Sequence, residues 1–251
     1  MGSTPEHDKE ITVLVTGFGS FSVHNPTNPS WEIAKSLPPF LPPPPQTASD
    51  ISYVKQHPPV RILVHPEPIR VAYENVCQLV PSLWDQQKVD YMIHIGMATG
   101  RRYYSVERRG HRDGYKLSDV DGKTLACCAD KDHMCPVPYW DDMPAELLSD
   151  CDIDDTWCRW RIAVPNTDVR ISEDPGRYLC DFIYFSSLAY LERHGQPRRV
   201  VFVHVPVNVD EQSIQVGVTA VLELIRAIVQ SGRMKDLTLP SNLSVQYMLN
   251  E

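Results

Sequence analysis

The sequence has no long apolar segment. No run of apolar residues approaches the roughly 18 that a membrane-spanning helix requires. The first ten residues are polar and acidic, without the apolar stretch of a signal peptide. We therefore expect a cytosolic (cytoplasmic) protein with no membrane contact.

An excess of basic residues is also missing. The 251-residue chain has 24 Lys and Arg against 32 Asp and Glu, which gives a formal net charge of −8. A surface that binds nucleic acid needs the opposite balance, so the composition argues against a nucleic-acid partner. Apolar residues make up 42% of the chain and charged residues 22%, which is typical of a globular protein with a core.

Cysteine pairs with metal-ligand spacing are absent too. None of the seven cysteines belongs to a C-x2-C pair, and the adjacent Cys127 and Cys128 have a poor spacing for chelation. An odd number of cysteines without a signal peptide indicates reduced thiols. We expect no metal and no cofactor, with structural zinc as the minor alternative for residues 110–160. The candidate ligands of that alternative are Cys127, Cys128, Cys135, Cys151, Cys158, His111 and His133.

The glycine pattern of a dinucleotide site is incomplete. Only Gly17 and Gly19 of a G-x-G-x-x-G motif follow the first apolar segment, which argues against a nucleotide cofactor. Phe18 and Phe21 lie in the same turn, at the carboxyl end of a predicted strand, where open α/β sheets hold their ligands. They either line a small apolar pocket or pack in the core beneath the turn.

Alternating strand and helix patterns predict the fold class. Apolar, β-branched segments predict buried strands at 11–16, 89–95 and 200–205, with a weaker candidate at 61–65. Apolar residues at helical spacing predict helices at 28–37, 70–87, 178–193 and 210–230. Their alternation predicts an α/β fold with a mostly parallel sheet.

A single domain accounts for most of the chain. We expect it to span residues 11–235, between a flexible N-terminus at 1–10 and a C-terminal tail at 236–251. Clustered prolines predict an exposed loop at 38–50. Residues 110–165 are polar, acidic and rich in Cys and Pro, so we expect an irregular insert with only short elements.

Three residues suited to nucleophilic catalysis lie near the ends of predicted elements. Cys180 lies in the first turn of a predicted helix, where the helix dipole and unpaired N–H groups lower the pKa of a thiol. His204 ends the strand at 200–205, and Glu107 follows the glycine-rich turn after 89–95. Taken singly, each has an ordinary structural alternative: a structural cysteine, a core histidine and a surface glutamate. Together they supply a nucleophile, a base and an orienting acid.

Four ordered segments resemble the pyroglutamyl peptidase type I family of cysteine peptidases. VLVTGFGSFSVHNPTNPSWEIAKSL (13–37) resembles the family's opening strand, its GF-x-PF turn and its NPSW helix start. IGMATGRRYYSVER (95–108) resembles the glycine-rich turn and ER pair, SEDPGRYLCDFIYFSSL (172–188) the AGT-x-x-C-N segment, and VFVHVP (201–206) the F-I-H-I-P strand. The resemblance implies a single-domain α/β/α sandwich with a mostly parallel, mixed central sheet.

The resemblance also implies roles for individual residues. Matched by position, Cys180 is the nucleophile, His204 the general base and Glu107 the residue that orients the histidine. Phe18 and Phe21 match the aromatics that pack on the substrate ring. Met97 matches a backbone contact to the ring amide, and Arg101 a supporting arginine. The implied partners are peptides with an N-terminal pyroglutamate, bound by a monomer or homo-oligomer.

Departures from the family pattern leave alternatives open. Arg177, Tyr178 and Leu179 replace small residues before the nucleophile, and Asp181 places a negative charge beside a thiolate, which opposes its ionisation. A diverged relative that binds pyroglutamyl or similar peptide ends without catalysis is therefore the main alternative. A scaffold whose Cys-rich insert carries the function is a third hypothesis. A nucleoside phosphorylase-like enzyme, the fourth, lacks an obvious phosphate loop.

Overall fold

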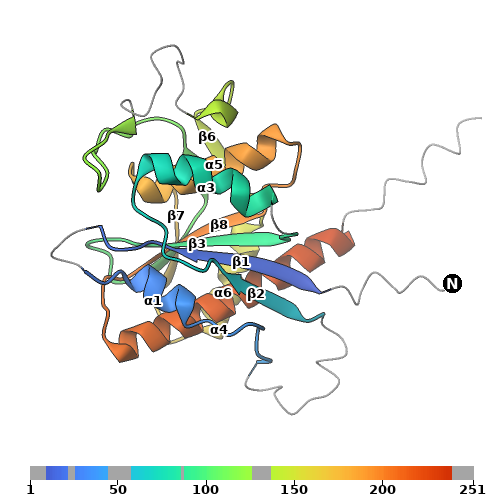
Figure 1. Ribbon diagram of the computed structural model, residues 1–251. Helices are drawn as coiled ribbons and strands as arrows, with labels where there is room; N and C mark the ends of the chain where they lie inside the picture. Colours follow the sequence, from blue (N-terminus) through green and yellow to red (C-terminus); the bar gives the residue numbers. More distant parts are fainter. Residues whose placement is uncertain (1–9, 22–25, 45–57, 86–87, 126–136, 239–251) are drawn as a thin grey trace, which may run out of the picture.

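Near-continuous apolar runs form the middle of one sheet. The computed structural model describes residues 10–21, 26–44, 58–85, 88–125 and 137–238 (Figure 1). Strands β1 (Ile11–Gly17), β3 (Tyr91–Met97) and β8 (Val200–Val205) are neighbours and run parallel. Their residues are almost all buried, as expected for strands covered on both faces. The three strong strand predictions are confirmed.

Three shorter strands complete a six-stranded sheet of order β2-β1-β3-β8-β4-β7. They are β2 (Val60–Val64), β4 (Tyr104–Glu107) and β7 (Val169–Ser172). Only β4 and β8 pair antiparallel among these neighbours. The sheet is therefore mostly parallel and mixed, as predicted.

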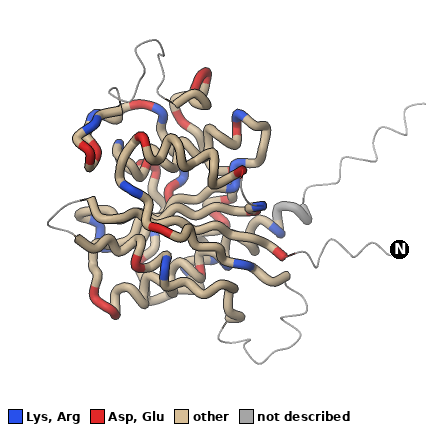
Figure 2. Tube along the Cα trace, viewed as in Figure 1, with Lys and Arg blue, Asp and Glu red and all other residues tan. Residues whose placement is uncertain are grey.

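Helices cover both faces of the sheet (Figure 1). Helices α3 (Tyr73–Asp85) and α5 (Leu179–Arg193) lie on one face, and α1 (Pro29–Lys35), α4 (Ile153–Ala163) and α6 (Glu211–Thr238) lie on the other. Each helix layer packs on the sheet through its own hydrophobic cluster. The predicted α/β/α sandwich is confirmed, and the central strands β1, β3 and β8 carry no Lys, Arg, Asp or Glu (Figure 2).

Helix α6 is longer than predicted and runs into the segment expected to be a tail. It extends to Thr238, three residues past the predicted domain end at 235. By length and composition alone it could cross a membrane, but 56% of its most apolar window is buried inside the protein. It is a core helix of the lower layer in Figure 1.

The prediction of irregular structure over residues 110–165 is wrong in its second half. A two-stranded sheet pairs β5 (Arg109–His111) with β6 (Glu146–Leu148), and a 3-10 turn spans Pro138–Trp140. The eleven-residue helix α4 then begins at the N-cap Asp152, whose side chain accepts a hydrogen bond from the N–H of Asp155. Cys127, Cys128, Cys135 and His133 lie outside the described residues.

The proline-rich segment runs along the outer edge of β2. Over its described part, residues 38–44, it forms no helix, as predicted. The N–H of Ile62 donates to the carbonyl of Pro39 at 2.9 Å, and the N–H of Leu41 donates to the carbonyl of Val60 at 2.9 Å. The segment thus provides hydrogen-bond partners for backbone groups of the edge strand β2. Without them, these groups would be open to pairing with another chain.

Candidate active site

One face of the sheet carries the candidate catalytic residues because of strand register. Gly96 of β3 lies directly opposite His204 of β8, and Ser105 of β4 lies opposite His204 on the other side. Glu107 follows Ser105 by two residues and faces Phe202. Residues opposite one another, and residues two apart, share a face of a sheet. This face is the one that α5 covers.

Glu107 and His204 form a buried pair. Oε1 of Glu107 lies 2.7 Å from Nδ1 of His204, and their side chains are 0% and 3% exposed. Burial raises the pKa of Glu107, but the hydrogen bond and charge of His204, together with the Arg101 guanidinium, outweigh it and hold that pKa below its ordinary value. The carboxylate therefore stays ionised and holds the imidazole in one orientation.

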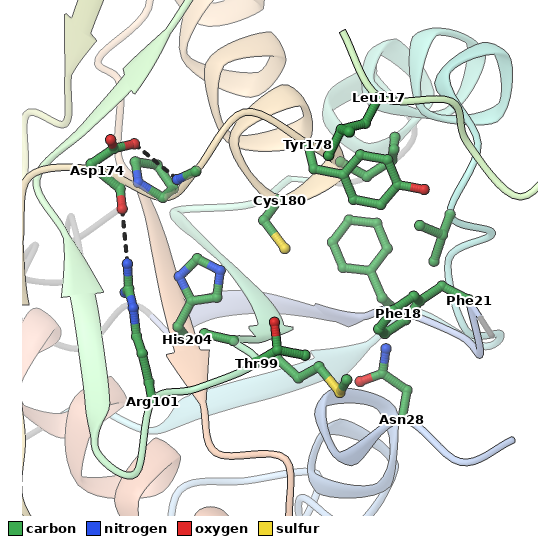
Figure 3. Close-up of a pocket in the computed structure, with 16 residues that line it drawn as sticks. Phe18, Phe21, Asn28, Thr99, Arg101, Leu117, Asp174, Tyr178, Cys180 and His204 are labelled. Atoms are coloured by element: carbon green, nitrogen blue, oxygen red, sulfur yellow. Dashed lines mark hydrogen bonds between the residues drawn. The ribbon is translucent and has the colours of Figure 1, made fainter. Parts of the chain in front are cut away.

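Cys180 lies directly above Gly96. A Cβ atom added to Gly96 would come within 2.8 Å of the Cys180 sulfur, so only glycine leaves room there. Since Gly96 neighbours His204 in the sheet, the thiol and the imidazole lie beside each other, and Figure 3 shows both side chains directed into the same cavity. The structure thus brings Glu107, His204 and Cys180 together.

The expected lowering of the Cys180 pKa is wrong. Burial, together with the Glu107 and Asp181 carboxylates, raises the pKa of this thiol to about 12. The helix start was correctly placed, because α5 begins at Leu179. The helix dipole favours the thiolate, but burial away from water and two nearby acids disfavour it more strongly. A thiolate at this position therefore requires a base that accepts its proton.

The guanidinium of Arg101 donates hydrogen bonds to three groups of the protein. One guanidinium nitrogen, Nη1, donates to Oε1 of Glu107 at 2.8 Å and to Oγ of Ser105 at 2.7 Å. The other, Nη2, donates to the main-chain carbonyl of Asp174 at 2.9 Å (Figure 3). Arg101 therefore links the acid of the buried pair to the loop that precedes the Cys180 helix.

The cavity beside Cys180 has an aromatic side and a polar side. Its volume is about 530 Å³. Phe18, Phe21, Tyr178 and Leu117 lie to one side of the sulfur in Figure 3, and His204, Arg101 and Asp174 lie to the other. The described lining residues are Phe18, Phe21, Asn28, Val71, Met97, Ala98, Thr99, Arg101, Leu117, Asp174, Pro175, Gly176, Tyr178, Leu179, Cys180 and His204.

The first turn holds the aromatic residues through a small polar network. The N–H of Phe18 donates to Oγ of Ser30 at 3.0 Å, and Nδ2 of Asn28 donates to the carbonyl of Gly19 at 2.9 Å. Gly17 packs so closely on Ser30 that a Cβ atom would come within 2.6 Å of its carbonyl oxygen. The start of α1 therefore fixes the turn that presents Phe18 to the cavity.

All seven predicted site residues lie at this one place. Phe18, Phe21, Met97 and Arg101 line the cavity together with Cys180 and His204, and Glu107 lies behind His204. Gly96 is not among the predicted site residues, although the structure places the Cys180 sulfur directly above it. The sequence analysis also missed Leu117, for which the sequence carries no signal.

Metal ligation finds no support within the described residues. No group of three or more His, Cys, Asp or Glu side chains there could hold an ion. Of the described cysteines, Cys158 and Cys180 carry free thiols. The thiol of Cys180 therefore stands beside a buried acid–imidazole pair, in an arrangement suited to acyl transfer.

Comparisons with known proteins agree on one family. A family model described as pyroglutamyl peptidase matches residues 61–230. The human protein named pyroglutamyl-peptidase 1 is 32% identical over 194 residues, which cover 77% of this chain and 78% of the human one. The pyrrolidone-carboxylate peptidase of Bacillus mycoides is 25% identical over 196 residues, 78% of each chain.

Solved structures show the same fold. A mutant pyrrolidone carboxyl peptidase from Pyrococcus furiosus aligns with a TM-score of 0.65 and 23% identity, over 88% of this chain and 99% of that one. The pyrrolidone carboxyl peptidase of Thermococcus litoralis aligns with a TM-score of 0.66 and 16% identity, over 90% and 96% of the two chains. At these identities the likeness concerns the fold.

Proposed function

The chain belongs to the pyroglutamyl peptidase family, and from that premise we propose that it is a cysteine omega-peptidase that removes N-terminal pyroglutamate from peptides. One observation carries the proposal: a buried Glu107–His204 pair, with 2.7 Å between Oε1 and Nδ1, stands beside the thiol of Cys180 in a cavity with an aromatic wall. The free thiols of Cys158 and Cys180 suit a reducing, cytosolic environment.

The cavity suits a pyroglutamyl ring. The ring is small, compact and neutral, with one lactam donor and one carbonyl acceptor, so apolar walls with a few polar partners fit it. We place it on the aromatic side, against Phe18 and Phe21, with Met97 offering its backbone. The peptide chain that follows the ring then extends toward the opposite side of the cavity, past His204.

The proposed reaction proceeds through a thioester. His204 takes the proton of the Cys180 thiol, and the thiolate attacks the pyroglutamyl carbonyl carbon, forming a C–S bond. The C–N bond breaks as His204 returns the proton to the leaving amine. Water, activated by His204, then hydrolyses the thioester, which frees pyroglutamate and restores the thiol.

Three groups support this chemistry in the proposal. Glu107 keeps Nδ1 of His204 occupied, so that Nε2 is left for proton transfer with the thiol. Backbone N–H groups at the start of α5 stabilise the oxyanion of the tetrahedral intermediate. Arg101 acts as a positioning residue, since its donors bind Glu107, Ser105 and the carbonyl of Asp174.

A non-catalytic relative that binds pyroglutamyl peptide ends is the second candidate. The observation that favours it is the thiol of Cys180, whose pKa burial raises to about 12. If His204 does not accept the proton, such a thiol is a poor nucleophile near neutral pH. This candidate keeps the aromatic cavity and loses the reaction.

Hydrolysis of a fluorogenic pyroglutamyl amide by the purified protein under reducing conditions separates the two. We expect turnover by the wild type and a loss of more than about 1,000-fold in Cys180→Ala, as for removal of a catalytic nucleophile. Cys158→Ala, at an exposed cysteine, is the control and should keep full activity. A folded wild type that binds a pyroglutamyl peptide without cleaving it would establish the binder instead.

A further inference from the structure

Asp181 follows the proposed nucleophile directly and is electrostatically unfavourable there. Its side chain is fully buried and is not among those that line the cavity. Burial raises the pKa of its own carboxyl to about 8. Its charge is also one of the causes that raise the pKa of Cys180. A carboxylate that hinders the ionisation of a neighbouring nucleophile needs a compensating role.

The contacts of Asp181 join α5 to β5. Oδ1 of Asp181 accepts a hydrogen bond from the main-chain N–H of His111 at 2.9 Å, and Oδ2 lies 3.2 Å from Nδ1 of the same histidine. Nη1 of Arg177 donates to Oδ2 at 3.3 Å. Next to this contact, Gly110 packs on α5 so closely that a Cβ atom would lie 3.0 Å from the backbone of Phe185.

The segment 112–118 that follows β5 contributes Leu117 to the wall of the cavity. Tyr115 donates its hydroxyl to the carbonyl of His111, which holds the start of this segment. The hydroxyl of Tyr73 donates to the carbonyl of Leu117 at 3.0 Å, and the hydroxyl of Tyr178 donates to the carbonyl of Ser118 at 3.2 Å. Leu117 and Tyr178 lie side by side at the cavity in Figure 3.

We propose that Asp181 is a positioning residue whose buried side-chain oxygen fixes the Cys180 turn of α5 against β5, and through β5 fixes the wall segment 112–118. The proposal rests on the proposed function for its kinetic consequences. It separates two effects of Asp181 that have opposite signs. The acceptor oxygen favours activity by holding the turn and the wall. The negative charge, present once the pH exceeds the raised pKa of this carboxyl, opposes formation of the thiolate.

Two substitutions separate these effects. Asp181→Asn keeps an oxygen that accepts from the His111 N–H but removes the charge, and Asp181→Ala removes both. With a pyroglutamyl amide as substrate, we expect Asp181→Ala to raise KM and lower kcat, with a fall of about tenfold or more in kcat/KM. Asp181→Asn should stay within about threefold of wild type. Glu192→Gln, on the exposed end of the same helix, is the matched acid-to-amide control.

The pH profile of Cys180 alkylation by iodoacetamide reports the charge effect, most directly in Asp181→Asn, which keeps the acceptor oxygen. In both variants the profile should shift to lower pH, because one of the acids beside the thiol is gone. The groups that face Asp181 are His111 and Tyr115 from the β5 side and Arg177 at the start of α5, with Asp174 and Glu146 farther out. None of these groups is changed in either variant.

Amide hydrogen exchange tests the tether without any activity. Residues 109–118 should exchange at least about tenfold faster in Asp181→Ala than in wild type, and at nearly the wild-type rate in Asp181→Asn. Equal exchange in all three proteins, or an Asp181→Asn variant as impaired as Asp181→Ala, would overturn the proposal. If Asp181→Ala does not fold, Asp181→Asn is compared with wild type alone. Exchange of residues 109–118 at least about tenfold faster in Asp181→Asn than in wild type would then overturn the proposal. A wild type without peptidase activity would refute the proposed function, and exchange would still test the tether.

Discussion

At the scale of single residues, Gly96 decides whether the proposed nucleophile can lie beside its base. It faces His204 across the β3–β8 pair, and the sulfur of Cys180 occupies the space where a side chain would be. The resemblance implies a glycine-rich turn after this strand, with a backbone contact to the substrate ring at Met97. The structure adds a different reason for the glycine, because the space is filled by a cysteine 84 positions later in the chain.

Gly96→Ala should therefore damage the site more than the fold. The new Cβ would lie 2.6 Å from Cζ of Phe202 and 2.8 Å from the Cys180 sulfur, so the thiol must move. We expect kcat/KM for a pyroglutamyl amide to fall about 100-fold, as for a misplaced reactive group. The free energy of unfolding should fall by about 1–3 kcal/mol.

The matched control is Gly195→Ala. Gly195 has φ +61° in the turn after α5 and nothing within 4 Å of an added Cβ. An alanine in this left-handed conformation costs about 1–2 kcal/mol and should leave kcat/KM unchanged. Urea denaturation and steady-state kinetics on both variants make the comparison. Equal activity of Gly96→Ala and wild type would show that the thiol does not need its position above Gly96.

The Cys180 thiol also shows why sequence position alone is a poor guide to reactivity. Its place at the start of a helix is visible in the sequence and predicts a lowered pKa. Burial raises this pKa instead, and so does the carboxylate of Glu107, which lies 73 residues earlier in the chain. Such contributions depend on which strands are neighbours, and the sequence does not display that.

At the scale of elements, three polar side chains tie together the elements that carry the site. Nδ1 of His94 on β3 lies 2.7 Å from Oγ1 of Thr16 on β1, and Nε2 lies 2.9 Å from Oγ of Ser187 on α5. All three side chains are buried. These contacts set α5, and with it Cys180, in register with the strands that carry Phe18 and Gly96.

This connection makes stability depend on pH. Burial lowers the pKa of His94 to about 3, whereas an unfolded histidine titrates near 6.5. Between these values the unfolded chain binds a proton that the folded protein does not, so the free energy of unfolding falls as the pH falls. From pH 6 to pH 4 this single group should contribute a slope of about 1.4 kcal/mol per pH unit.

Urea denaturation of wild type and His94→Gln at several pH values measures that contribution. The variant should be less stable at pH 7, because its contacts to Thr16 and Ser187 change, but its stability should decline less steeply with acid. His194→Gln, at an exposed histidine beyond the end of α5, should keep the wild-type slope. Identical slopes in wild type and His94→Gln would mean that His94 is not the acid-sensitive group.

Elements with one dominant physical signal were predictable, and those with mixed signals were not. Strands β1, β3 and β8 are apolar throughout, and helices α3, α5 and α6 show apolar residues at helical spacing. Helix α4 was missed because acidic and basic residues surround its apolar positions. Its signals were an Asp152 cap, acids in the first turn and a tryptophan pair three residues apart at Trp157 and Trp160.

At the scale of the whole molecule, the site exists because distant segments end at one edge of the sheet. Strand ends predicted from glycine and proline placed Phe18, Met97 and His204 together, since parallel strands have their carboxyl ends at the same edge. The position of Glu107 could not be predicted from strand ends alone. Strand β4 lies between β8 and β7, antiparallel to β8 and parallel to β7, and its pairing with β8 brings Glu107 behind His204. Pairing order is a property of the assembled sheet.

Helix α4, which lies in the region predicted to be an irregular insert, is part of the core. Trp160 of α4 is fully buried, and its Nε1 donates to the carbonyl of Ala220 on α6 at 2.8 Å.

Trp160→Ala should lower the free energy of unfolding by about 3–5 kcal/mol, through lost burial and a cavity. Ile162→Ala, two residues away but 80% exposed, should change it by less than about 0.5 kcal/mol. Urea denaturation followed by circular dichroism checks both, and a Trp160→Ala variant as stable as wild type would mean that α4 is a dispensable appendage after all.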